Sequence, residues 1–223
     1  WKRNIKEKSI KIIQRIEGIS LSINISSITK SFSKNRVHDN FSLKIKTGER
    51  LGIFGPNGCG KTTLLKIISG IMSFESGEIL INEEYLKSNN PESRRETYYL
   101  GHSTGFYKSL TAAENLTFIA NLYNKKKPNV GAILERFELD KNERKQIRFF
   151  SKGMLQRLKI AACIILDCKI LLLDEPIAGL DEEGIKLFYN FYKIWKKSNK
   201  TILIVSHDIN WLKKNTDRVL ELN

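Results

Sequence analysis

The chain of 223 residues is 41% hydrophobic and 28% charged, a balance that is typical of a folded globular domain and argues against a disordered or fibrous chain. No apolar stretch reaches the roughly 18 residues that a membrane-spanning helix needs, so we expect no bilayer crossing by the chain itself. The 38 basic residues outnumber the 24 acidic ones and give a net charge of +14, which suits an anionic surface of nucleic acid or lipid headgroups.

The first segment, residues 1–18, is basic. It contains six Lys or Arg residues and two Glu residues, and it lacks the long apolar centre of a signal peptide. We expect a basic N-terminal extension over residues 1–18, followed by one folded domain over residues 19–223.

Two kinds of strand pattern occur along the chain. Apolar and polar residues alternate over residues 21–25 and 41–45, as in half-buried antiparallel strands. Short apolar runs occupy residues 51–54, 170–173 and 202–205, as in strands that are buried on both faces of a parallel sheet. Together these patterns predict an α/β fold with a mainly parallel sheet core and an antiparallel β edge.

The strand patterns are absent between about residues 103 and 166. Thr111 and Glu114 have the spacing of a capping box, which predicts a helix from there through Tyr123. Helical spacing returns after Ser151. We therefore expect an inserted helical subdomain over about residues 103–166.

A phosphate-binding loop is the strongest chemical signal. Residues 55–62 read GPNGCGKT, a full match to G-x-x-x-x-G-K-[S/T], directly after the apolar run 51–54 and before a helical pattern that ends at Gly70. Backbone N–H groups at such a strand-to-helix turn bind an anion. Lys61 is expected to reach the β- and γ-phosphates, and the Thr62 hydroxyl to ligate Mg²⁺. The expected nucleotide-binding residues of this loop are Gly55, Pro56, Asn57, Gly58, Cys59, Gly60, Lys61, Thr62 and Thr63.

Two adjacent carboxylates, Asp174 and Glu175, follow the apolar run 170–173. Burial of two acids together is costly unless a cation compensates. We expect Asp174 to hold Mg²⁺ through its water shell and Glu175 to polarise the water that attacks the γ-phosphate. Together with the phosphate loop, the pair predicts a nucleotide hydrolase.

Three further segments resemble the nucleotide-binding subunits of ABC transporters, and the resemblance covers about residues 20–223. Residues 150–157 read FSKGMLQR and are similar to the signature motif of that family, although Lys152 and Met154 stand where Gly and Gln are commonest. Residues 178–181 (AGLD) resemble its D-loop, and residues 206–208 (SHD) resemble its switch-histidine segment. This order of motifs identifies an ABC-type nucleotide-binding domain with a P-loop NTPase (RecA-like) core.

The resemblance implies a role for each matched residue. Glu175 and His207 are the expected catalytic residues, and Asp181 belongs to the D-loop. Ser151 and Gly153 open a helix whose partial positive charge suits a phosphate presented by another chain. Phe32 falls where the family stacks an aromatic ring on adenine. The implied cofactors are ATP and Mg²⁺.

The resemblance also implies partners. A second nucleotide-binding domain, expected as a homodimer, completes each ATP site, and an integral membrane permease docks near residues 102–111. Such a subunit lies peripherally on the cytoplasmic face of a bacterial inner membrane or the matrix face of a mitochondrial inner membrane. The alternatives are a soluble ABC-type ATPase acting on nucleic acid, which the charge of +14 favours, and a regulatory binding module without turnover. Nucleic-acid members of the family usually carry two nucleotide domains or long coiled-coil insertions, and this chain has neither, so no specific nucleic acid is expected.

One local pattern bears on the cargo. Residues 99–102 (YLGH) and 110–116 (LTAAENL) resemble the ATP-binding subunit of the haem exporters used in cytochrome c biogenesis. An exporter of another cargo is the alternative. His102 stands where most ABC subunits have a glutamine, and because imidazole nitrogen is a poor ligand for Mg²⁺, we expect it to act through a water or at the partner interface.

Overall fold

Five parallel strands form the central sheet, in the order β6, β7, β8, β3, β9. The computed structural model describes residues 20–33, 35–86, 94–101, 105–126, 128–142 and 144–223. The three apolar runs predicted as buried strands lie side by side as β3, β7 and β8, which confirms the parallel core. The strands are β6 (Thr97–Leu100), β7 (Ile170–Asp174), β8 (Thr201–Val205), β3 (Arg50–Phe54) and β9 (Arg218–Glu221).

The antiparallel strands form a second sheet of their own, in the order β2, β1, β4, β5, rather than an edge of the parallel sheet. Ile23 of β1 pairs with both Ile45 of β2 and Ile81 of β4, and these three side chains are buried. The strands are β1 (Leu21–Phe32), β2 (Asn35–Lys46), β4 (Ser76–Ile81) and β5 (Glu84–Tyr85). The predicted α/β fold class is confirmed, with two sheets in place of one.

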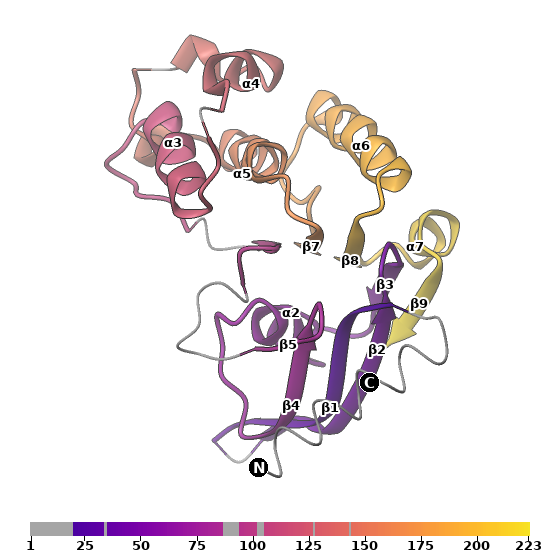
Figure 1. Ribbon diagram of the computed structural model, residues 1–223. Helices are drawn as coiled ribbons and strands as arrows, with labels where there is room; N and C mark the ends of the chain where they lie inside the picture. Colours follow the sequence, from indigo (N-terminus) through magenta and orange to yellow (C-terminus); the bar gives the residue numbers. More distant parts are fainter. Residues whose placement is uncertain (1–19, 34, 87–93, 102–104, 127, 143) are drawn as a thin grey trace.

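Helix α2 (Lys61–Ile68) packs between the two sheets (Figure 1). Leu64, Leu65, Ile67 and Ile68 are buried against apolar side chains of both sheets. Ile170 and Leu172 of β7 face this layer, whereas Leu171 and Leu173 face the helices on the other side. The alternation explains why residues 170–173 of β7 are all apolar, because both faces of the strand are covered.

Helices α3, α4, α5 and α6 gather on the face of the parallel sheet that is opposite β1, β2 and β4 (Figure 1). The predicted capping box is confirmed, because Thr111 Oγ1 accepts from Glu114 N at 3.2 Å and Thr111 N donates to Glu114 Oε2 at 2.7 Å. The predicted limits of a helical subdomain, about 103–166, stay a prediction. The segment contains α3 (Ala112–Leu122), α4 (Val130–Arg136), α5 (Lys152–Leu166) and the short 3-10 turns η2 (Asp140–Asn142) and η3 (Ile147–Phe149).

Helix α6 (Glu182–Lys197) carries an aromatic stripe at helical spacing. The buried side chains of this stripe are Phe188, Phe191, Tyr192 and Trp195. The Phe191 ring stacks on Phe137 with centroids 5.1 Å apart.

Helix α7 (Ile209–Asn215) follows β8 and packs near β3 and β9. Across the described residues, the structure contains no helix that is long and apolar enough to cross a membrane.

The predicted N-terminal extension, residues 1–18, and the predicted site residue His102 lie outside the described residues.

Candidate active site

The predicted chemical residues converge at one edge of the parallel sheet. The phosphate loop follows β3, Asp174 ends β7, and His207 lies two residues beyond β8. Because these strands are parallel and adjacent, their carboxyl ends meet at the same edge, where α/β proteins bind ligands. Residues that are more than 100 positions apart in the chain are thereby neighbours in space.

The phosphate loop is shaped around the Lys61 side chain. Lys61 is buried, and its Nζ donates to the carbonyl oxygens of Gly55 at 2.8 Å and Pro56 at 2.7 Å. Gly60 caps α2 with a left-handed backbone (φ 99°), and a Cβ there would lie 2.5 Å from Val37 Cγ1. The first turn of α2 contains no acidic residue. Its N–H groups therefore suit a phosphate, and no carboxylate of that turn opposes the ligand.

The Asp174 carboxylate and two hydroxyl groups form the corner of the site where the sequence predicts Mg²⁺, which we call the metal corner. Asp174 Oδ2 accepts from Thr62 Oγ1 at 2.8 Å and from Tyr99 Oη at 3.0 Å. Burial raises the pKa of Tyr99, so the phenol is neutral and donates. Asp174 Oδ1 is buried and has no hydrogen-bond partner among the described residues. This orphaned oxygen and the oxygen donors around it fit Mg²⁺, which prefers oxygen ligands and keeps several of its waters.

Glu175 is held in a left-handed backbone conformation, with φ 50°. Its N–H donates to the Val205 carbonyl of β8 at 3.2 Å, and its Oε1 lies 2.7 Å from Nε2 of His207. A left-handed backbone at a residue other than glycine costs about 1–3 kcal/mol and is found mainly where the surroundings impose it. Here the turn after β7 directs the carboxylate towards the histidine that follows the neighbouring strand.

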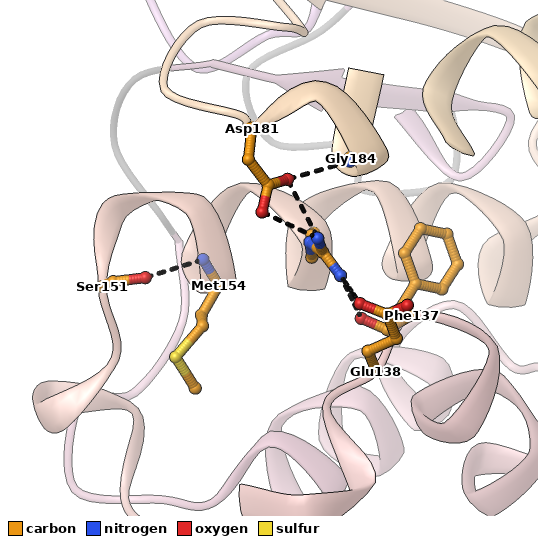
Figure 2. A network of polar contacts seen from close by, with 7 residues as sticks. Phe137, Glu138, Ser151, Met154, Asp181 and Gly184 are labelled. Carbon is orange, nitrogen blue, oxygen red and sulfur yellow. Dashed lines mark hydrogen bonds and ion pairs between the residues drawn. The ribbon is translucent and has the colours of Figure 1, made fainter. Parts of the chain in front are cut away.

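The signature and D-loop residues meet at the ends of two helices. Ser151 caps α5, where its Oγ accepts from Met154 N at 3.2 Å, and Asp181 caps α6 by accepting from Gly184 N at 2.9 Å (Figure 2). A Cβ on Gly153 would lie 3.2 Å from the Gly179 carbonyl oxygen, so the two segments touch.

Arg157 connects the two helices, a contact that the sequence did not reveal. Its Nη2 lies 2.9 Å from Asp181 Oδ1, and its Nη1 pairs with Glu138, two residues beyond the end of α4. Figure 2 labels both of these acidic partners. The hydrogen bond from Arg157 is the main cause of the lowered pKa of Asp181. The arginine thus ties α5 to the D-loop and to α4.

Ser151 and Gly153, two of the predicted nucleotide-binding residues, belong to the N-terminal end of α5 rather than to the phosphate loop. No hydrogen bond or ion pair links Ser151 or Gly153 to that loop within the part of the chain that the structure describes. A cavity of about 410 Å³, lined by Asp174, Glu175 and the first turns of α5, lies between the metal corner and this helix.

The predicted adenine-stacking residue, Phe32, ends β1. Its side chain has 45% of its surface exposed, and Lys30 Nζ lies 5.2 Å from its ring centroid.

The chain is similar to known proteins over most of its length. The profile of the ABC transporter family matches residues 38–178. The uncharacterized ABC transporter ATP-binding protein YcbN of Bacillus subtilis (strain 168) is 34% identical over 200 residues, 88% of this chain and 65% of YcbN. The bacitracin transport ATP-binding protein BcrA of Bacillus licheniformis is 34% identical over 203 residues, 90% of this chain and 66% of BcrA. The chain thus spans about two thirds of the length of these two relatives.

A solved structure of the ATP-binding subunit of an ABC transporter superposes with a TM-score of 0.81 at 25% identity, covering 90% of this chain and 85% of that one. ATPase domains of this family bind ATP with Mg²⁺ and hydrolyse it. The range matched by the profile includes the phosphate loop at residues 55–62 and the acidic pair at residues 174–175. The chain therefore belongs to the ABC transporter family, among its ATP-binding subunits.

Proposed function

We propose that this chain hydrolyses ATP to power export by a separate membrane subunit. The observation that carries the proposal is the convergence of the Lys61 loop, the Thr62–Asp174 contact and the Glu175–His207 pair at one sheet edge. Such an arrangement binds a triphosphate, neutralises its charge with Mg²⁺ and places a base beside the γ-phosphate.

The proposal assigns a role to each predicted residue. Thr62 and Asp174 hold Mg²⁺, Glu175 accepts the proton of the attacking water, and His207 orients Glu175 and the γ-phosphate. Phe32, whose ring is exposed, stacks on the adenine. His102 acts through a water or at the interface with the membrane partner. The remaining nucleotide-binding residues are Gly55, Pro56, Asn57, Gly58, Cys59, Gly60, Lys61, Thr63, Ser151 and Gly153.

Ser151 and Gly153 act on the nucleotide of a second copy of the chain. Ser151 is exposed at the start of a helix of 15 residues, whose N-terminus carries a partial positive charge. In one copy this terminus has no bonded link to the phosphate loop within the described residues, so it is available to a phosphate on another molecule. Two copies then enclose ATP between the Lys61 loop of one and the Ser151 helix of the other.

The membrane partner docks near residues 102–111, which precede α3. Tyr107 in this segment is 54% exposed, and its ring meets Phe118 of α3 edge to face at 5.0 Å. Exposed aromatic rings are enriched at protein interfaces. The chain would thereby lie peripherally on the cytoplasmic face of a bacterial inner membrane or the matrix face of a mitochondrial one, and the bacterial sources of both relatives favour the first.

The comparisons do not support haem as the cargo or a role in cytochrome c biogenesis. BcrA, one of several relatives whose names state a substrate, is named as an ATP-binding protein of bacitracin transport. The haem resemblance rests on residues 99–102 and 110–116 and on the form of the signature at residues 151–158, which other small exporters share. His102 lies outside the described residues. We propose that the membrane partner selects the cargo. The name of BcrA supports a peptide antibiotic as the class of cargo.

The net charge of +14 favours a second candidate, an ATPase that acts on nucleic acid. ATP turnover distinguishes the transporter subunit from the nucleic-acid ATPase. It is measured on the chain with and without duplex DNA, RNA and ribosomes at physiological salt. We expect nucleic acid to leave turnover unchanged and to bind only in a steeply salt-dependent manner, because non-specific phosphate contacts release counterions. Copurification from native membranes should recover an integral membrane protein. Many-fold stimulation by nucleic acid or ribosomes without any membrane partner would overturn the transporter proposal.

A further inference from the structure

The hydroxyl of Tyr99 reaches the metal corner from the edge strand β6. Tyr99 pairs with Leu172 in the parallel register of β6 and β7, so the two side chains point to the same face of the sheet. Asp174, two residues beyond Leu172, shares this face because side chains alternate along a strand. The Tyr99 ring therefore leans along the sheet to place its hydroxyl 3.0 Å from Asp174 Oδ2.

Gly101 leaves the space that the Tyr99 ring occupies. Gly101 directly follows Leu100, the last residue of β6, which pairs with Leu173 beside Asp174. A Cβ on Gly101 would lie 2.2 Å from the Cζ and hydroxyl oxygen of Tyr99, well inside van der Waals contact. The absence of a side chain at position 101 thus permits the contact between Tyr99 and Asp174.

The two oxygens of Asp174 have unequal surroundings. Oδ2 accepts from both Thr62 and Tyr99, whereas Oδ1 is buried without a hydrogen-bond partner among the described residues. Two donors on one oxygen fix the rotation of the carboxylate about its Cβ–Cγ bond. Oδ1 is consequently directed away from the hydroxyls and remains available to a metal-bound water.

We propose that Tyr99 is a positioning residue of the magnesium site, which holds the Asp174 carboxylate in the rotation that serves Mg²⁺. The inference rests on the proposed role of Asp174 as a magnesium residue. Partners that orient a metal-binding side chain typically contribute about 10- to 100-fold to metal affinity. Because Asp174 acts through water, we expect the effect of Tyr99 at the lower end of this range, about 10-fold.

The test is calorimetric binding of ADP to the full chain at a series of Mg²⁺ concentrations and in excess EDTA. In Tyr99→Phe the Mg²⁺ concentration for half-maximal enhancement of ADP affinity should rise about 10-fold, while ADP affinity in EDTA should stay at the wild-type value. Tyr98→Phe is the matched control. Its hydroxyl donates to the Lys159 carbonyl at 3.4 Å on the opposite face of the sheet, and we expect wild-type Mg²⁺ dependence there.

Two further variants complete the design. Gly101→Ala should reproduce the Tyr99→Phe shift, because its Cβ displaces the ring. Asp174→Asn should abolish the Mg²⁺ enhancement. If Asp174→Asn behaves as expected while Tyr99→Phe keeps the wild-type dependence, or loses ADP affinity equally in EDTA, the role of Tyr99 is refuted and the proposed function stands. If Asp174→Asn retains the wild-type dependence, both proposals fall.

Discussion

Replacement of Glu175 by glutamine is expected to lower ATP turnover about 100- to 10,000-fold, the usual contribution of a general base, while MgATP affinity stays close to the wild-type value. The amide has the size of the carboxylate but cannot accept the proton of the attacking water. The contact with His207, at 2.7 Å in the wild type, can persist through the amide oxygen. Phosphate release and equilibrium binding of ATP, measured on the same preparation, separate the two effects.

Glu182→Gln is the matched control for this variant. Glu182 is an exposed carboxylate in the first turn of α6, and we expect its replacement to leave turnover unchanged. Turnover in Glu175→Gln at the wild-type rate would show that another group activates the water.

Lys61→Ala is expected to have the second large effect. The buried ammonium of Lys61 is the cation of the phosphate loop, and hydrogen bonds to charged groups contribute about 1.5–3 kcal/mol each. We expect ATP affinity to fall about 10- to 100-fold. Turnover at saturating ATP should fall about 100- to 1,000-fold, because the ammonium also stabilises charge that develops in the transition state.

Lys66→Ala serves as the control, because Lys66 lies in the last turn of the same helix. It should bind and hydrolyse ATP as the wild type does. If Lys61→Ala binds ATP with unchanged affinity, the phosphate loop is not the nucleotide site of this chain.

The parallel core and the phosphate loop were predictable because their signals are local. An apolar run such as residues 170–173 is buried on both faces wherever it lies in a covered parallel sheet. The loop of residues 55–62 combines a strand, a glycine turn and a helix start within one short segment, so its geometry follows from its own residues.

The separate antiparallel sheet was not predictable in the same way. Strand β1 pairs with β4, which begins at Ser76 and is separated from β1 by β2, β3 and α2. Alternation over residues 21–25 indicates a half-buried strand but does not say which strands lie beside it. Whether such strands extend the parallel sheet or form another sheet depends on packing against α2, a tertiary effect.

The contacts of Tyr99 and Arg157 were likewise hidden from the sequence. Tyr99 reaches a carboxylate that is 75 residues away, and Arg157 pairs with one that is 24 residues away. Both residues lie in segments with recognisable motifs. A motif specifies the types of residue at given positions, but it does not specify which side chains they contact in the fold. The register of β6 with β7 and the packing of α5 against α6 decide these partners.

The central claim is that two copies of the chain enclose ATP between the Lys61 loop of one and the Ser151 helix of the other. Sedimentation of the Glu175→Gln chain in saturating ATP tests this claim. We expect the molecular mass to double with ATP and to remain that of one chain with ADP. Adding Ser151→Arg to the same chain should leave ATP binding intact and prevent the doubling. A single-chain mass for Glu175→Gln with ATP bound, or a dimer that Ser151→Arg does not disturb, would contradict the claim.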